Sequence, residues 1–262
     1  MKDLKVRRKT NYTNAPRPSA IIGDVHGSWY TLEKMLGILD DLLGEDKLLV
    51  SVGDLHDKGG VPYWAASDVS EVGSVKVLRW AVSQQENNKL VVVDSNHGRA
   101  LTRKISKVSS STKPDLDRTF RELSMQSDSE ELIGKVEKLL GQAPSFALFK
   151  GHSTSRISVA HAAVSQRIFS KKMLSPQEER FCIHTRDFVW SGESTAVVGH
   201  VRVPKPQRTS SVLPSGVKGG DLLKIDTGCG EPGGYLTAYI PQADDFLSVK
   251  MDERDVFENY KK

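Results

Sequence analysis

Side chains that bind divalent cations follow five short apolar runs of the sequence. The runs end in Gly23-Asp24-Val25-His26, Gly53-Asp54, Ser95-Asn96-His97, Ala160-His161 and Gly199-His200. Carboxylate oxygens and imidazole nitrogens are ligands that manganese, iron and zinc take in proteins. One Gly-Asp or Gly-His after a strand is usually only a turn. Five in order, each after an apolar run, are much harder to explain as turns, and they predict a metal site.

The spacing of these residues favours two ions over one. Asp24 and His26 lie two residues apart, so at an extended strand end their side chains point the same way and can chelate one ion. Asp54 has two carboxylate oxygens and can bridge this ion to a second one. The remaining ligands of the second ion would be Asn96, His161 and His200. The sequence thus predicts a two-metal centre, and a single-metal hydrolase that uses only the second site stays open.

Short strands alternate with helical patterns in the first half of the chain. Strands are expected at 19–23, 47–52 and 90–93, each followed by a helix, the first of which covers 28–43. This alternation predicts a largely parallel sheet with helices on its faces, where polar residues past the carboxyl ends of strands collect in one crevice. The second half is richer in strands, several close enough to be antiparallel neighbours. They are expected at 145–149, 156–160, 195–199, 222–226, 235–240 and 246–251.

The predicted fold is therefore of the α/β class, leaning towards α+β, with a mixed β-sheet sandwich flanked by helices. Residues 1–17 are expected to form a basic, solvated tail, and residues 18–262 one domain. Residues 106–140 read as a polar loop and two amphipathic helices, at 116–123 and 130–140. They predict a small helical cap insertion that sets substrate choice. Residues 201–220 are rich in Pro, Ser and Gly and are predicted to be a mobile loop.

Composition excludes several classes of protein. Hydrophobic residues make up 38% of the chain and charged residues 27%, enough apolar material for a substantial core and too much for a disordered chain. The formal charge of +4 is only mildly basic and is weak evidence for nucleic acid. No apolar run has the length of a membrane span, and no signal peptide is evident. The two cysteines are far apart, so a reducing cytoplasm is the expected location.

The motif order resembles that of the calcineurin-like metallophosphoesterases, in their phosphoprotein-phosphatase-like branch. The motifs are Gly-Asp-x-His-Gly, Gly-Asp-x-x-Asp-Lys-Gly, Asn-His, His and Gly-His. The segments 197–204 and 225–238 are similar to the phosphatase module of bacterial and phage polynucleotide kinase-phosphatases and to the symmetrical diadenosine tetraphosphatases. The resemblance covers about residues 18 to 240. It implies a metallophosphoesterase-like fold and the hydrolysis of phosphate esters.

The resemblance also gives the matching residues their roles. Two divalent ions are implied, with Mn²⁺ expected and Ni²⁺, iron or zinc as alternatives. With Asp54 shared, the ligands of these ions would be Asp24, His26, Asp54, Asn96, His161 and His200. His97 would be the general acid that protonates the leaving oxygen, held in that role by Asp57. A hydroxide shared by the two ions would attack phosphorus, so no protein nucleophile is required.

Departures from the family pattern bear on phosphate binding. Lys58 stands where the family usually has Arg, which keeps the charge but loses the planar fork that binds phosphate in two places. Asp94-Ser95 precede Asn96 where the family usually has Gly, and in protein phosphatases an Arg as well, which weakens the protein-phosphatase interpretation. The other candidates for phosphate contacts are Arg99, Arg103 and Arg202.

The remaining histidines and Cys229 are predicted to lie outside the catalytic set. His56 is expected to be an exposed loop residue that could touch substrate, and His152 and His184 are expected on the surface. Cys229 lacks an obvious neighbouring base and is expected to be a small buried residue.

Three substrate classes stay open: a phosphorylated small molecule or nucleotide such as a dinucleoside polyphosphate, a nucleic-acid phosphate, and a phosphorylated protein. The nucleotide and nucleic-acid classes are preferred, and a protein serine/threonine phosphatase is the alternative. A metal-binding scaffold without catalysis is a further alternative, which the presence of His97 argues against. Neither a membrane nor an obligate protein partner is indicated.

Overall fold

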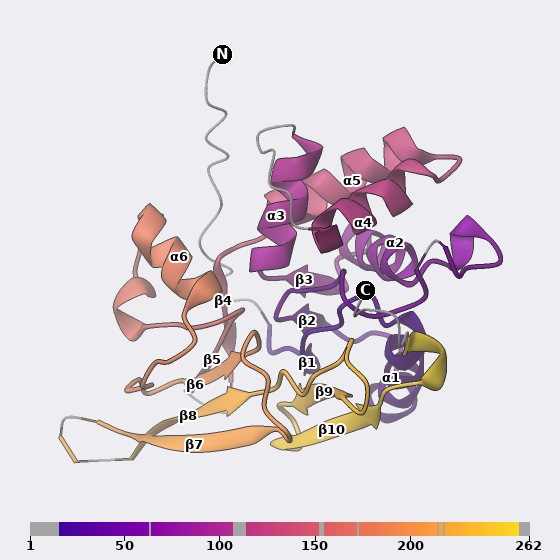
Figure 1. The fold of residues 1–262 in the computed structure, drawn as a ribbon. Coiled ribbons are helices and arrows are strands. Elements are labelled where there is room, and N and C mark those ends of the chain that lie inside the picture. Colours follow the sequence, from indigo (N-terminus) through magenta and orange to yellow (C-terminus); the bar gives the residue numbers. More distant parts are fainter. Residues whose placement is uncertain are drawn as a thin grey trace.

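The computed structural model describes residues 16–62, 64–106, 114–151, 155–171, 173–213, 215–216 and 218–256. Figure 1 shows two β-sheets with helices on their outer sides. Each sheet has five strands, in the orders β10-β9-β1-β2-β3 and β4-β5-β6-β8-β7. Both sheets mix parallel and antiparallel pairs, so the predicted mixed sandwich flanked by helices is confirmed.

The first sheet holds the three strands predicted in the first half of the chain. They are parallel to one another, and the last two strands of the chain are added antiparallel at the β1 edge. Its strands are β1 (Ala20–Ile22), β2 (Leu49–Ser51), β3 (Leu90–Val92), β9 (Tyr235–Ile240) and β10 (Asp245–Lys250).

The prediction that neighbouring strands of the second half pair antiparallel is confirmed for β4 with β5 and for β9 with β10, and the second sheet also contains parallel pairs. β5 pairs in parallel with β6, and β6 with β8, whereas β4 and β7 are antiparallel edge strands. Its strands are β4 (Phe146–Lys150), β5 (Arg156–Ala160), β6 (Thr195–Val198), β7 (Gln207–Val212) and β8 (Lys218–Lys224).

The helices cover the outer faces of the sandwich (Figure 1). Buried side chains of α1, α2, α4 and α5 pack on the first sheet, and those of α6 pack on the second. The bounds are α1 (Trp29–Leu43), α2 (Gly73–Glu86), α3 (Asn96–Ile105), α4 (Pro114–Ser124), α5 (Ser129–Gly141) and α6 (Pro176–His184).

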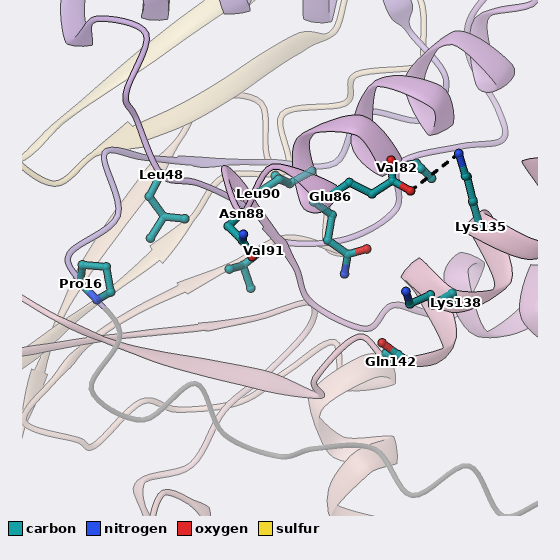
Figure 2. A pocket seen from close by; sticks show the side chains of 11 residues that line it. Pro16, Leu48, Val82, Glu86, Asn88, Leu90, Val91, Lys135, Lys138 and Gln142 are labelled. Atoms are coloured by element: carbon teal, nitrogen blue, oxygen red, sulfur yellow. Dashed lines mark ion pairs between the residues drawn. The ribbon is translucent and has the colours of Figure 1, made fainter.

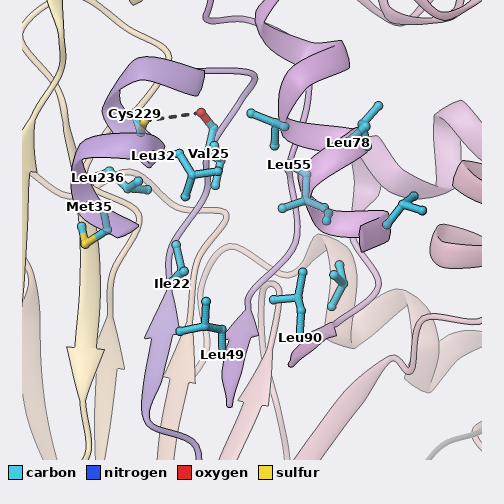
Figure 3. Close-up of a cluster of buried hydrophobic side chains, with 14 of the residues drawn as sticks. Ile22, Val25, Leu32, Met35, Leu49, Leu55, Leu78, Leu90, Cys229 and Leu236 are labelled. Atoms are coloured by element: carbon cyan, nitrogen blue, oxygen red, sulfur yellow. Dashed lines mark hydrogen bonds between the residues drawn. The ribbon is translucent and has the colours of Figure 1, made fainter. Parts of the chain in front are cut away.

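Three clusters of buried apolar side chains hold the layers together. Figure 3 shows part of the cluster between the first sheet and its helices, where Leu32 and Met35 of α1 meet Ile22 and Leu49 of the strands. A second cluster fills the space between the two sheets. Burial of each such leucine contributes roughly 1.5–3 kcal/mol. The strand ends that carry the polar motifs are therefore fixed by a rigid support.

The prediction of a mobile loop at residues 201–220 is wrong. This segment contains β7 and the start of β8, which pair with each other in an antiparallel hairpin. Four of the first five residues of β7 are exposed, so this edge strand lacks the alternating apolar pattern from which strands are predicted.

The segments predicted as a tail and a cap lie partly outside the described residues. Only Pro16 and Arg17 of the tail are described, and Arg17 donates a hydrogen bond to the carbonyl of Pro241. Residues 107–113 of the insertion and His152 also lie outside the described part. The two helices of the predicted insertion, α4 and α5, contact α2 and α3. Within the described residues, no helix combines the length and the apolar character needed to cross a membrane.

Candidate metal centre

The five predicted motifs meet at one edge of the sandwich. Asp24 follows β1, Asp54 follows β2, Asn96 begins α3 just after β3, and His161 and His200 follow β5 and β6. These strands run in parallel within their own sheets, so their carboxyl ends share an edge. Within this group two sets of three side chains present ligand atoms that all lie within 4.8 Å of one another.

His161 is the centre of one set. Its Nε2 lies 2.6 Å from Asn96 Oδ1, 3.1 Å from His200 Nδ1 and 3.5 Å from Asp54 Oδ2. Its other ring nitrogen lies 2.9 Å from the carbonyl of Val52, which requires a proton on Nδ1. Nε2 is then unprotonated, and a carbonyl of this kind orients histidine ligands in metal sites.

The other set is His26, Asp54 and His97. The Nε2 of His26 is 3.9 Å from Asp54 Oδ2 and also 3.9 Å from the Oδ2 of Asp24, which lies outside the set. The backbone N–H of His200 donates to the Asp24 carboxylate at 3.2 Å, which holds the two motifs together. The Asp54 carboxylate belongs to both sets, which is the position that a bridging ligand would need.

The charges at this edge fit bound cations. The side chains of Asp24 and Asp54 are buried, and Asp226, which follows β8, lies close to both. Burial and the neighbouring Asp226 and Asp54 carboxylates raise the pKa of Asp24 well above its usual value. Such a group of buried acids is unfavourable unless positive charge offsets it. The donor set of carboxylates, amide and imidazoles suits divalent manganese, iron, nickel or zinc.

The imidazoles are neutral, as metal ligands must be. Burial lowers the pKa of His26 to about 3 and that of His200 to about 4. Burial would raise the pKa of Asp54, but His161, His97 and His26 outweigh it and hold this pKa well below its usual range. Asp54 is therefore an anion between imidazoles.

The backbone at this edge is strained. Seven non-glycine residues of the described chain have positive φ, and five of them belong to the motifs: His26, Asp54, Asp57, Lys58 and His200. Such conformations cost free energy and persist where the surrounding structure imposes them, often at functional sites. Gly199 has a steric role, because any side chain there would collide with the Asp24 carboxylate.

His97 and Asp57 form a hydrogen-bonded pair beside the metal ligands. His97 Nδ1 lies 2.8 Å from Asp57 Oδ2, so its Nε2 faces the site, 3.8 Å from Asp54 Oδ2. Burial lowers the pKa of His97, but Asp54 and Asp57 outweigh it and raise the pKa above its ordinary value. The proton on His97 Nε2 therefore faces the site, where it can be transferred to a bound substrate.

The prediction that His56 is an exposed loop residue is wrong. Its side chain is fully buried, with Nδ1 3.1 Å from Asp57 Oδ2. Burial would raise the pKa of Asp57, but His56 and His97 outweigh it and hold this pKa well below its usual range. Polarity and loop position suggested exposure, whereas the loop folds back under α4.

The predicted phosphate-binding residues differ in their distance from the site and in their ion pairs. Lys58 is half-buried near the site, where its positive charge partly opposes the rise that burial causes in the pKa of Asp24 and of Asp226. Arg99 points elsewhere, since its guanidinium binds Asp94 and Glu179 at 2.6 and 2.9 Å. Arg202 is half-exposed and paired with Glu231. Arg103 is exposed in the last turn of α3.

Three residues near the site escaped the sequence analysis. Asp226 could have been found, because like the others it ends an apolar run, Leu222–Ile225. Ser95 could also have been found as the N-cap of α3, where its Oγ accepts from Gly98 N and from Asp54 N, both at 3.1 Å. Thr119, whose hydroxyl donates to Asp57, gave no signal, because it lies in an amphipathic helix 62 residues along the chain.

Neither cysteine resembles a nucleophile. Cys229 is buried, as predicted, and its Sγ lies 3.4 Å from the carbonyl of Val25 (Figure 3). Burial raises the pKa of both thiols, for Cys182 to about 12. The thiolate forms needed for reaction are therefore scarce at neutral pH.

A surface pocket at another place on the molecule is not lined by any of the candidate metal ligands. It lies between the amino ends of β2 and β3, marked by Leu48 and Leu90, and the helices α2 and α5 (Figure 2). An ion pair between Glu86 and Lys135 crosses its rim. The candidate metal-ligating side chains lie at the opposite ends of the strands.

Residues 18–168 match the family model described as calcineurin-like phosphoesterase, and this match spans more than half of the chain. The chain therefore belongs to the calcineurin-like phosphoesterase family, which confirms the predicted resemblance. Comparison with curated proteins gave no significant match.

Solved structures share this fold at low sequence identity. A protein assigned as a diadenosine tetraphosphatase superposes with a TM-score of 0.62 at 20% identity, over 94% of this chain and 99% of that one. A hypothetical protein from Pyrococcus horikoshii has a TM-score of 0.52 at 11% identity, over 90% and 89% of the two chains. A point mutant of a cold-active protein tyrosine phosphatase gives 0.52 at 11% identity, over 96% and 85%. These likenesses support the fold.

Proposed function

We propose that this protein is a dinuclear metal-dependent phosphoesterase that hydrolyses nucleotide-type phosphate esters. The observation that carries the proposal is the Asp54 carboxylate, which belongs to two ligand sets at one strand edge. Asp24 and His26 would hold one ion with Asp54. Asn96, His161 and His200 would hold the other. When bound, such ions supply Lewis acidity and lower the pKa of bound water.

The chain's own residues would orient the proton donor and protonate the leaving oxygen of the ester. Asp57 holds His97 through Nδ1, which leaves Nε2 to give its proton to the leaving oxygen of the ester. Lys58 adds positive charge close by, suited to a phosphoryl oxygen. The two cysteines are buried and are not the nucleophile in this proposal, in which activated water is the attacking group.

The first test is metal dependence. Chelated protein is expected to lose hydrolysis of nitrophenyl phosphate, and added Mn²⁺ is expected to restore it, because no protein side chain replaces the activated water. Metal analysis should find two ions per chain. One tightly bound ion per chain would contradict the bridging role of Asp54, and a binding scaffold would show no turnover with Mn²⁺, Ni²⁺ or Zn²⁺.

Positive charge beside the site favours a substrate with several phosphates. Four exposed cationic or protonatable side chains of α3, α6 and the segment after it form what we name the α3–α6 basic cluster: Arg103, Arg180, His184 and Arg186. None of them forms an ion pair with a carboxylate of the described residues. The Arg99–Glu179 bridge joins the two helices, which stand at the same edge of the molecule (Figure 1).

The cluster lies within electrostatic reach of the metal ligands. Partial burial lowers the pKa of His184, and the charges of Arg99, Arg180 and Arg103 lower it further. After burial and His161, Arg186 and His184 also lower the pKa of His200. Phosphates beyond the scissile one would meet these cations, as in a dinucleoside polyphosphate such as that named for the structural relative.

Removing the positive charge of the α3–α6 basic cluster should weaken the binding of substrates with several phosphates more than that of substrates with one. The triple variant Arg103→Ala, Arg180→Ala, Arg186→Ala is expected to raise KM for diadenosine tetraphosphate about tenfold, which corresponds to about 1.4 kcal/mol. Nitrophenyl phosphate, with one phosphate, should be nearly unaffected. Arg156→Ala is the matched control, since this exposed arginine starts β5 at the far end of the strand. Equal KM changes for both substrates, or faster turnover of a phosphopeptide, would reject this substrate class.

A further inference from the structure

A helix of the insertion reaches the residue that holds His97. Thr119 of α4 is fully buried, and its Oγ1 donates a hydrogen bond to Asp57 Oδ1. The other oxygen of the same carboxylate, Oδ2, accepts from His97 Nδ1 and lies next to His56 Nδ1. Both oxygens of Asp57 are thus engaged, one by the insertion and one by the two histidines.

We propose that Thr119 is a positioning residue for His97, acting through Asp57. This role rests on the proposed phosphoesterase function. A carboxylate held only at Oδ2 can rotate about its Cβ–Cγ bond, and the imidazole that it orients would turn with it. The Thr119 hydroxyl fixes the plane of the carboxylate and, with it, the direction in which His97 Nε2 points.

The helix is itself fastened to the loop that carries Asp57. Arg118, the neighbour of Thr119, is buried, and its Nη2 lies 3.4 Å from the carbonyl of Gly59, two residues after Asp57. Its Nε lies 2.7 Å from Glu122 Oε1, and its guanidinium lies 5.5 Å from the ring centroid of Trp64. These contacts set the depth of α4, so that the Thr119 hydroxyl reaches the carboxylate.

The inference gives the insertion a second task. Its sequence predicted a cap that selects substrate, whereas Thr119 makes α4 part of the support of the proton donor. A residue with this task affects proton transfer to the leaving group and leaves metal binding alone. Esters with poor leaving groups depend on the proton donor far more than those with good ones, because an anion of low basicity leaves without it.

The test compares Thr119→Val, which keeps the shape and removes the donor, with Thr119→Ser, which restores a hydroxyl. For Thr119→Val we expect kcat to fall about tenfold with phenyl phosphate and less than twofold with 2,4-dinitrophenyl phosphate, with two ions still bound. Thr119→Ser should recover most of the rate. In a His97→Ala background, Thr119→Val should have no further effect on kcat, since the two residues act as one unit.

A matched control separates positioning from general damage. Thr31 is also buried, and its Oγ1 donates to Asp255 Oδ2 at 2.7 Å, with no contact to His97. Thr31→Val should lower thermal stability as Thr119→Val does and leave the ratio of the two rates unchanged. A fall of equal size with both esters, or an additive effect with His97→Ala, would overturn the role of Thr119.

A readout that needs no turnover completes the test. In metal-free protein, the Nδ1–H proton of His97 is expected as a downfield NMR resonance protected by its hydrogen bond to Asp57. It should broaden by exchange in Thr119→Val and persist in Thr119→Ser. Persistence in Thr119→Val would overturn the inference. Absence of any turnover in the wild-type protein would instead overturn the proposed function and, with it, this catalytic role.

Discussion

Replacing Asp54 with Asn is expected to reduce hydrolysis about a thousandfold, a loss of about 4 kcal/mol in transition-state stabilisation. Asp54 Oδ2 lies 3.5 Å from His161 Nε2, 3.9 Å from His26 Nε2 and 3.8 Å from His97 Nε2. No other carboxylate of the described residues belongs to both ligand sets. An amide has no charge to offset two cations and offers one oxygen, so both ions should be bound more weakly.

Metal content decides whether that loss has the proposed cause. Calorimetric titration of chelated Asp54→Asn with Mn²⁺ should show weakened binding at both sites, whereas His26→Ala should weaken one site and His200→Ala the other. Asp187→Asn is a suitable control, because Asp187 is exposed just after α6 and outside both ligand sets. Two ions bound with unchanged affinity in Asp54→Asn would disprove the bridging role.

The candidate ligands could be brought together from the sequence because each follows its strand directly. Strand ends in parallel sheets share an edge by geometry, so the apolar runs before Asp24, Asp54 and His161 were enough to bring these residues together. The strand bounds differed by one or two residues for most strands, for example Ala20–Ile22 against the expected 19–23. The fold class followed from the same local signals.

What the sequence analysis missed depends on contacts between distant or weakly patterned segments. β7 reads as a loop because only Ser211 of its six residues is buried. α6 is short and polar and so gives a weak periodic signal, although Ser175 and Glu178 form a readable capping box and Pro176 stands at the first helical position. The burial of His56 and the contact between Thr119 and Asp57 have no local signature, since they follow from the packing of α4 on the loop after β2.

The structure admits two roles for His97, and one variant separates them. Its Nε2 lies with His26 and Asp54 among atoms close enough for a metal ion, yet its Nδ1 is engaged by Asp57. As a ligand, His97 would be needed for metal affinity with every substrate. As a general acid, it would be needed for proton transfer alone, and more so when the leaving group is basic.

His97→Ala is therefore expected to lower kcat with phenyl phosphate by about a hundredfold to ten-thousandfold, the usual range for a general acid. With 2,4-dinitrophenyl phosphate the loss should stay below about tenfold, because this leaving group needs no proton. Two ions should remain bound with unchanged affinity. Arg156→Ala is the control, because this exposed residue starts β5 at the end of the strand away from the ligand sets. If one ion is lost and both esters slow equally, His97 is a ligand, and the proton must come from another group.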